Sequence, residues 1–574
     1  MKLRSDSGSG LGVIAAVTAL MQLPAVLCGF ELCDSGFYMT FYDNIFTHPE
    51  ATGYNFMYYL SGLAGGAVAA MTGGSILALR LAGALCNVLC TCLVWNLIRV
   101  PRRFIAVLIT SLLVTAGAWG SPLTFYNDLL TILLALMSLT LLAKALSHDS
   151  REERSTRRRT AALLLLSGAA AGINTLTRIP NVLEIFFVIL IPLPARRDTA
   201  RSSLAWLGGW MAGLSAGLLA AAACGHLPLL ADTIRDLLDT AATPGAESTH
   251  GLSSLVDAQI SSWVSIGKTA LKLILLYAAW LLTLRATAKS ATRLAAAIRL
   301  TAGAALTAAA IWVLLRADIM TALTATAVTG AALALRCRDL RIPAAAMLLM
   351  TFILPLGSDN GIYNAGTPIL WGTLAVAVTF YRQTAKGATL LCAVALLATC
   401  AASLAAGGTY FDDTPMSRMT GRIDSPTAAG IRTSPARAAR INALTDSLRR
   451  HTSPGDTLLV YGSAPMLNHL TATVPAIGCS WPELLSAAQL ERRLDTRSAP
   501  QYIMVLRFKT LGATLGTPSQ DFALGHDTPQ GRFHTPAKSA VMARYIEKKH
   551  YRAVSENADY TLYIRTRPAP APAR

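Results

Sequence analysis

The sequence predicts an all-α polytopic membrane bundle of about 13 transmembrane helices, followed by a soluble α/β domain. Hydrophobic residues make up 53% of the 574 residues and charged residues only 14%, and the mean hydropathy is +0.45. Apolar runs long enough to cross a membrane follow one another from Leu11 to Ala406. Beyond Ala406 the hydropathy falls, and Pro, Arg, Ser and Asp become frequent. The composition excludes an ordinary soluble globule.

The apolar runs define the expected membrane spans and their orientation. The expected spans are 11–30, 76–98, 104–119, 129–146, 161–177, 181–195, 203–223, 263–284, 295–315, 318–335, 342–356, 368–381 and 388–406. Basic residues cluster at alternate ends of these runs, which is the positive-inside pattern. It predicts a cytoplasmic N-terminus and an extracytoplasmic tail. We expect the protein to lie in a bacterial inner membrane, where lipids surround the bundle.

The formal net charge of +18 does not indicate a nucleic-acid partner, because the basic residues lie between apolar runs and form no single patch. The first run lacks a clear small-x-small cleavage site, so an uncleaved anchor is expected and not a signal peptide. The segment 56–71 is short and rich in Gly and Ala, and we expect a helix at the outer interface. A further span there is the alternative.

The loops expected on the outer side carry the acids, amides and aromatic residues; they are 31–55, 120–128, 224–262 and 357–367. The ten cysteines form no ligand-spaced set, so no metal site is predicted. Cys33, Cys224 and Cys479 would face an oxidising compartment, but spacing does not determine whether they pair.

A domain boundary is expected near 407, with an extracytoplasmic α/β domain over 407–566. A helical pattern covers 435–451, and segments rich in Val, Ile and Tyr predict strands over 456–461, 501–507 and 560–565. The Pro- and Ala-rich end, 567–574, is expected to be disordered. The bundle domain is 1–406.

The first outer loop places Asp34 and Asp43 among aromatic residues beside the membrane. If the chain is helical after Gly36, Tyr38 and Tyr42 share a face. A carboxylate near an apolar interface can act as a general base, and aromatic rings can hold a sugar or a lipid headgroup. The alternative is an interfacial aromatic belt with solvated acids.

Two more outer segments carry candidate substrate-binding residues. Tyr126 and Asp128 precede an expected span, where Asp128 can contact substrate or simply cap the helix. The loop 355–368 is rich in Gly and polar side chains and is suited to closing over a sugar, with Asp359, Asn360 and Asn364 as candidates. A simple turn is the alternative for this loop.

Two arginines lie near the expected outer surface. Arg178 precedes Pro180 and is suited to a lipid phosphate, because a guanidinium binds phosphate oxygens in a bidentate manner. Snorkelling to lipid headgroups is an equally weighted alternative. For Arg80 the snorkelling interpretation is favoured.

The segment Asp34-Ser-Gly-Phe-Tyr38 directly after the first span, followed by Asp43, Pro49 and 54–60, resembles the GT-C superfamily of membrane glycosyltransferases. These include the protein mannosyltransferases and the aminoarabinose transferase of lipid A. The resemblance extends more weakly to 125–128 and 176–180. Ser35 stands where the family often has a second acid, which does not support metal dependence.

The resemblance implies an inverting transfer of a sugar from a polyprenyl-phosphate donor to a glycan, lipid or protein acceptor on the outer face. Asp34 is then the base, and basic groups hold the donor phosphate. A secondary transporter or flippase is the rival, but transporters place ionisable residues near the midplane and often carry repeats. This sequence concentrates polar residues in outer loops. A polymerase or ligase of surface polysaccharide is a third hypothesis.

Overall fold

The computed structural model describes residues 8–101, 103–119, 124–147, 154–194, 199–242, 252–290, 292–358, 360–384, 408–412, 414–510, 515 and 535–566. The expected span 388–406, the end 567–574 and Asp359 lie outside the described residues. The described chain is mostly helical, as predicted.

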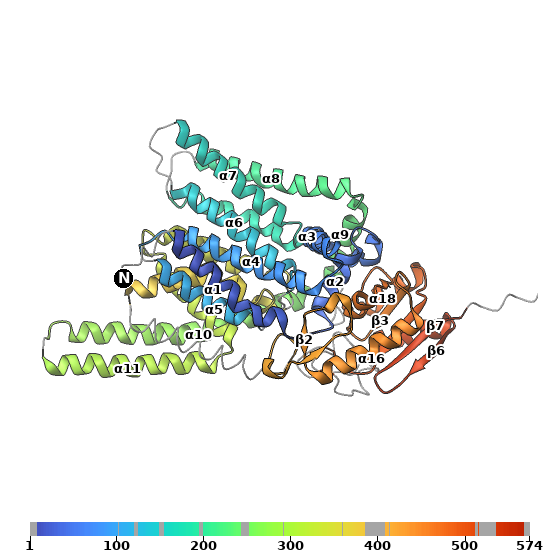
Figure 1. The fold of residues 1–574 in the computed structure, drawn as a ribbon. Helices are drawn as coiled ribbons and strands as arrows, with labels where there is room; N and C mark the ends of the chain where they lie inside the picture. Colours follow the sequence, from blue (N-terminus) through green and yellow to red (C-terminus); the bar gives the residue numbers. More distant parts are fainter. Residues whose placement is uncertain are drawn as a thin grey trace, which may run out of the picture.

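The bundle helices follow one another from residue 8 to residue 384. They are α1 (Gly8–Leu27), α2 (Asp34–Asn44), η1 (Pro49–Tyr58), α3 (Tyr59–Thr72), α4 (Ile76–Leu97), α5 (Arg103–Ala118), α6 (Asn127–Ser147), α7 (Arg154–Asn174), η2 (Ile179–Leu190), α8 (Thr199–Ala223), α9 (Leu227–Ala242), α10 (Leu252–Thr287), α11 (Arg293–Arg316), α12 (Ile319–Ala334), α13 (Arg341–Ile353), η3 (Gly361–Tyr363), η4 (Thr367–Leu370) and α14 (Trp371–Thr384). Figure 1 shows the long helices running side by side, with α10 and α11 forming a hairpin along one side.

Six of the described helices are long and apolar enough to cross a membrane: α1, α4, α6, α8, α10 and α11. Four shorter apolar helices accompany them: α5, η2, α12 and α13. The total of thirteen spans therefore stays a prediction. Glycines allow close packing within the bundle, because a Cβ at Gly168 of α7 would lie 2.0 Å from the Trp206 carbonyl oxygen of α8.

The segment expected as one outer loop over 224–262 is largely helical, so that prediction was wrong. It contains α9 and the beginning of α10, which starts at Leu252. In α9, Leu227, Leu230 and Ile234 recur at helical spacing among acidic residues. An amphipathic pattern of this kind has a low average hydropathy and was therefore mistaken for a loop. The helix expected over 56–71 is present as the end of η1 together with α3.

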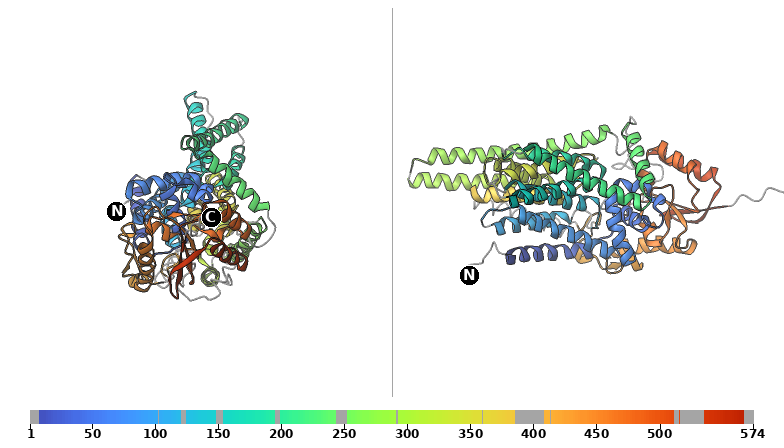
Figure 2. Two further views of the ribbon diagram at one scale, coloured as in Figure 1. Left: turned by 90° about the vertical axis from the view of Figure 1, so that its right-hand side faces the viewer. Right: turned by 90° about the horizontal axis from the view of Figure 1, so that it is seen from above.

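The strands and helices from residue 408 onward gather at one end of the bundle, remote from the N-terminus (Figures 1 and 2). Five strands form a sheet in the order β4 (Val474–Pro475), β3 (Thr457–Tyr461), β5 (Tyr502–Leu506), β7 (Tyr560–Arg565) and β6 (Tyr551–Glu556). Strand β3 is parallel to β4 and β5, whereas β7 is antiparallel to β5 and β6. Two short strands, β1 (Gly421–Arg422) and β2 (Arg432–Thr433), pair separately.

The helix expected over 435–451 is present as α16 (Pro435–His451), and the three expected strands are present as β3, β5 and β7. The other helices of this part are η5 (Met416–Arg418), η6 (Pro426–Ala428), α17 (Met466–Thr471), η7 (Pro482–Leu484), α18 (Ala487–Thr496) and α20 (Pro536–Lys548). Each is short, and α16 is the longest of the described helices after residue 408.

The residues after 408 pack directly on the first outer segment of the bundle. One hydrophobic core contains Phe30 and Phe41 together with Leu444 and Met504. The Met466 amide donates to the Leu32 carbonyl at 3.0 Å. A Cβ at Gly36 would lie 2.2 Å from the Met466 nitrogen, so only glycine allows α2 and α17 to approach this closely. The two parts are therefore joined by a shared core.

Candidate active site

The segments predicted to lie on the outer side meet at one end of the bundle. The Tyr38 hydroxyl of α2 donates to Asn127 at the start of α6. The Asn364 amide, after η3, donates to Asp128 at 3.0 Å. Gln259 of α10 donates to the Pro355 carbonyl at 2.6 Å. Segments that are far apart in the sequence thus form one polar region beside the sheet of the later residues.

Asp34 is the first residue of α2 and lies at the boundary between the bundle and the later residues. The Tyr410 hydroxyl donates a hydrogen bond to its Oδ2 atom at 2.5 Å. Burial raises the pKa of Tyr410 well above its usual value, and the neighbouring Asp34 charge raises it further. Tyr410 therefore stays protonated and fixes the direction of the Asp34 carboxylate.

Asp128 belongs to a chain of side-chain hydrogen bonds across α2, α6 and the loop after α13. Tyr38 donates to the Asn127 Oδ1 atom, and the Asn127 Nδ2 atom donates to Asp128 Oδ1 at 2.9 Å. Asn364 donates to the other Asp128 oxygen. Both carboxylate oxygens thus accept from side-chain amides, so helix capping does not account for Asp128.

The Tyr126 hydroxyl is buried and has no hydrogen-bond partner among the described residues. Burial raises the pKa of Tyr126 well above its usual value, and the charges of Asp128 and Asp34 raise it further. The hydroxyl therefore keeps its proton between two carboxylates. Buried polar atoms are normally paired, so a hydroxyl in this state is suited to contact a substrate group.

The aromatic side chains of α2 line the same region. The rings of Tyr38 and Tyr42 are stacked with centroids 6.4 Å apart, which confirms that they share a helix face. The Tyr38 ring also lies 5.8 Å from the rings of Tyr58 and Tyr126. Aromatic faces of this kind pack against the apolar face of a sugar ring.

Both snorkelling interpretations were wrong, because Arg178 and Arg80 point inward. Arg178 is 5% exposed and donates to the carbonyls of Leu354 at 2.7 Å and Leu356 at 3.1 Å. It also acts electrostatically on Asp128. Arg80 is 7% exposed and donates to the Gly29 carbonyl at 2.8 Å and to two further carbonyls at the end of α1.

Two described candidate residues, Asp43 and Asn360, lie apart from this group of side chains. Asp43 pairs with His469 of α17 at 2.6 Å, which docks α2 onto the later residues. Asn360 is exposed, and its backbone amide donates to Ser358. Asp359 lies outside the described residues. The structure thus brings together Tyr38, Tyr126, Asp128, Arg178 and Asn364, with Asp34 acting electrostatically on the Tyr38 and Tyr126 hydroxyls.

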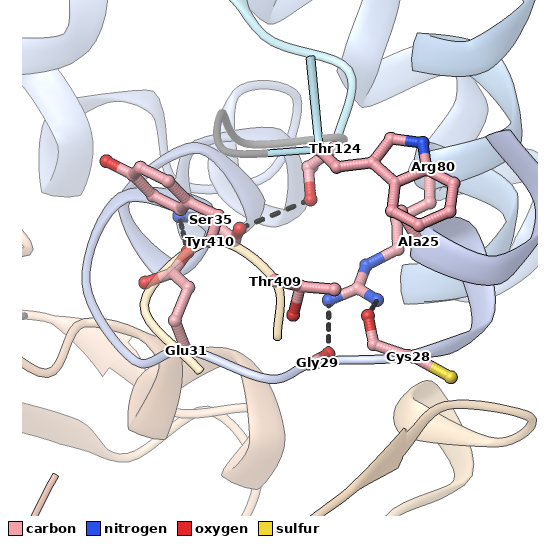
Figure 3. A pocket seen from close by; sticks show the side chains of 10 residues that line it. Ala25, Cys28, Gly29, Glu31, Ser35, Arg80, Thr124, Thr409 and Tyr410 are labelled. Carbon is pink, nitrogen blue, oxygen red and sulfur yellow. Dashed lines mark hydrogen bonds between the residues drawn. The ribbon is translucent and has the colours of Figure 1, made fainter. Parts of the chain in front are cut away.

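A small pocket adjoins Asp34, and it contains residues that sequence reasoning missed. Figure 3 shows Glu31, Ser35, Arg80, Thr124 and Tyr410 around it. Glu31 gives no ordinary capping signal in the sequence, because it lies two residues before Cys33, the N-cap residue of α2. Nothing in the sequence signals Tyr410, which is 376 residues from Asp34.

Cys33, Cys224 and Cys479 are free in this structure. Within the part of the chain that the structure describes, no group of three or more His, Cys, Asp or Glu side chains is placed to hold a metal ion.

Residues 63–219, from within α3 to near the end of α8, match the family model described as dolichyl-phosphate-mannose-protein mannosyltransferase. This part of the chain is therefore similar to the protein mannosyltransferases that the family model describes. The matched segment contains Tyr126, Asp128 and Arg178 and ends before the residues that form the sheet. No curated protein matches the chain.

Three solved structures show a distant likeness to this chain. An oligosaccharyltransferase from Archaeoglobus fulgidus, in complex with Zn and sulfate, is 13% identical over 86% of this chain and 68% of its own, with a TM-score of 0.43. The same enzyme tethered to an acceptor peptide is 12% identical over 98% and 75%, with a TM-score of 0.46. ArnT from Cupriavidus metallidurans bound to undecaprenyl phosphate is 12% identical over 99% and 100%, with a TM-score of 0.40.

Proposed function

We propose that the protein is a GT-C-type membrane glycosyltransferase, which moves a sugar from a polyprenyl-phosphate donor to an acceptor hydroxyl on the outer face of the membrane, with Asp34 as the general base. Asp34 accepts the proton of the acceptor hydroxyl as the acceptor oxygen bonds to the anomeric carbon. The bond from that carbon to the phosphate oxygen breaks, and the polyprenyl phosphate leaves with the bonding electrons. A single displacement of this kind inverts the anomeric configuration.

The observation that carries the proposal is the buried Tyr126 hydroxyl, which has no hydrogen-bond partner among the residues that the structure describes and on which the charges of Asp128 and Asp34 both act. A sugar or acceptor hydroxyl bound there would accept from Tyr126 and donate to a carboxylate. The family description supplies the donor class, because it names a polyprenyl-phosphate sugar, dolichyl phosphate mannose, for the proteins of that family.

Arg178 is the group that we assign to the donor phosphate. Its guanidinium has five N–H donors, and the bonds to Leu354 and Leu356 use two of them. These bonds orient the guanidinium beside Asp128, Asn364 and the loop after α13. A guanidinium held in this way can bind the phosphate oxygens and stabilise the charge of the leaving group.

The topology belongs to the same proposal: a bundle of thirteen spans over 1–406 and an extracytoplasmic domain over 407–566 in a bacterial inner membrane. The meeting of the expected outer segments with the later residues at one end of the bundle supports it.

The sugar and the acceptor, whether glycan, lipid or protein, are to be identified. Mass spectrometry of lipid-linked sugars and surface glycans, in cells with and without the gene, will name the donor sugar.

The test of the base is the Asp34→Asn variant, assayed with the purified polyprenyl-phosphate sugar identified in this way. We expect kcat to fall by about 10²- to 10⁴-fold, which is the usual contribution of general base catalysis. Asp446→Asn is the matched control, because the Asp446 side chain is 55% exposed on α16. Full transfer activity in Asp34→Asn would overturn the assignment, and loss of activity in both variants would show a nonspecific effect.

A further inference from the structure

Glu31 lies in the turn between α1 and α2, between the buried apolar residues Phe30 and Leu32. Although Glu31 is a carboxylic acid, it is only 3% exposed. A buried carboxylate is costly unless its oxygens are paired. Both oxygens of Glu31 are paired here. Oε2 accepts from the Cys33 amide at 2.5 Å, and Oε1 accepts from the Ser35 amide.

These bonds replace the usual cap of helix α2. The N-cap residue, Cys33, makes no side-chain capping bond. The first amides of a helix have no partner within the helix, and a carboxylate there also complements the positive end of the helix dipole. Glu31 supplies this cap from two residues upstream of Cys33, in a position that ordinary capping residues do not occupy.

The two amides that Glu31 binds belong to the residues on either side of Asp34. Ser35 is held a second time, because the Thr124 hydroxyl donates to its Oγ atom at 3.2 Å. Asp34 therefore lies in a backbone segment whose amides are held on both sides of it, while Tyr410 donates to its carboxylate. Figure 3 shows Glu31, Ser35 and Tyr410 together at the pocket.

We propose that Glu31 is a positioning residue that fixes the backbone on both sides of Asp34 and thereby aims the catalytic carboxylate. This role rests on the proposed function, in which Asp34 is the base. Glu31 itself touches no substrate in this proposal. An error of about 1 Å in the position of a catalytic group lowers rates on the order of 100-fold, so the cap can set kcat.

The surroundings of Glu31 act on its carboxyl group in both directions. Burial raises the pKa of Glu31, while the Ser35 and Cys33 bonds and the charge of Arg80 lower it. The two amide bonds that hold the backbone are therefore also bonds that favour the carboxylate form of Glu31.

The test compares Glu31→Gln, Asp34→Asn and the double variant. In Glu31→Gln, one oxygen becomes an amide nitrogen that faces a backbone N–H. We expect kcat to fall on the order of 100-fold with an unchanged KM for the donor. The double variant should be no slower than Asp34→Asn. Glu50→Gln, at a side chain that is 59% exposed, is the matched control.

Two outcomes overturn the positioning role: a wild-type kcat in Glu31→Gln, or a double variant that is clearly slower than Asp34→Asn. Full activity in Asp34→Asn would overturn the proposed function instead, whatever Glu31→Gln does.

If Glu31→Gln does not fold, Glu31→Asp serves in its place, because it keeps the charge but has a shorter side chain. It should lower kcat with an unchanged KM for the donor, and a wild-type kcat would overturn the proposal.

Discussion

A buried ion pair docks the later residues onto the first outer segment of the bundle. Arg437 Nε lies 3.5 Å from Asp412 Oδ1, and the two side chains are 3% and 0% exposed. Asp412 Oδ2 also accepts from the Phe30 amide at 3.2 Å and from the Thr433 hydroxyl at 2.5 Å. Arg437 also contacts the first outer segment, because it donates to the Phe30 carbonyl at 2.9 Å.

The variant Asp412→Asn tests how much this docking contributes. Asparagine has the same size, so no cavity forms, but the charge opposite Arg437 is lost and one acceptor becomes a donor. Removing one partner of a buried pair costs about 3–5 kcal/mol, and we expect the free energy of unfolding to fall by that amount. The cost comes chiefly from the Arg437 charge, which stays buried without its partner.

The matched control is Asp495→Asn, which breaks the pair between Asp495 and Lys548. That pair is shorter, at 3.1 Å, but its side chains are 48% and 64% exposed. Exposed pairs contribute about 0–1 kcal/mol, so this variant should lose no more than that. The expected difference in the free energy of unfolding between the two variants therefore comes from the burial of the ion pair and not from its length.

Urea unfolding in detergent micelles, followed by tryptophan fluorescence, measures both variants. A small loss in Asp412→Asn, equal to that in Asp495→Asn, would refute the reasoning that the buried pair joins the two parts. An unchanged dependence on urea concentration would show that the variants differ only in stability.

Two further predictions concern buried charged groups. Burial raises the pKa of Glu483 from 4.5 to about 7, so the folded state binds the extra proton and stability falls as the pH rises through this window. Between pH 5 and 8 the loss should approach about 3 kcal/mol by urea unfolding, and Glu483→Gln should abolish this slope; an equal slope in the variant would contradict the prediction. Arg80→Met leaves buried carbonyls at the end of α1 without donors and should cost about 1–3 kcal/mol in thermal unfolding. Arg201→Met, at an exposed position of α8, should cost almost nothing, and equal losses in the two arginine variants would contradict the expectation.

Local sequence pattern predicted one helix and three strands of the later residues, because their signals are local. Helix α16 begins at Pro435 behind a Ser434 cap whose side chain accepts from the Arg437 amide, so its start is encoded within a few residues. Strand β7 is rich in Tyr, Leu and Ile, which is a local strand signal, and its residues Tyr560 to Leu562 are buried. Strand β6 was missed, because its exposed residues show no alternating apolar pattern.

For the candidate site, the sequence predicted only which segments lie on the same side of the membrane. The alternation of basic loops indicated that Asp34, Asp128 and Asn364 lie on one side, and the structure brings their segments together. Sequence does not show where a long side chain points, so the inward contacts of Arg80 and Arg178 were missed. Nor does it show a contact such as that of Tyr410 with Asp34, which depends on how the two parts dock.

The most direct test of the central claim is single-turnover sugar transfer by Asp34→Asn with the polyprenyl-phosphate donor already bound. Because the proposed mechanism places Asp34 at the acceptor hydroxyl and Arg178 at the phosphate, the variant should bind the donor as tightly as the wild type. It should then transfer the sugar about 10²- to 10⁴-fold more slowly. Transfer at the wild-type rate from a fully bound donor would contradict the assignment of Asp34 as the base.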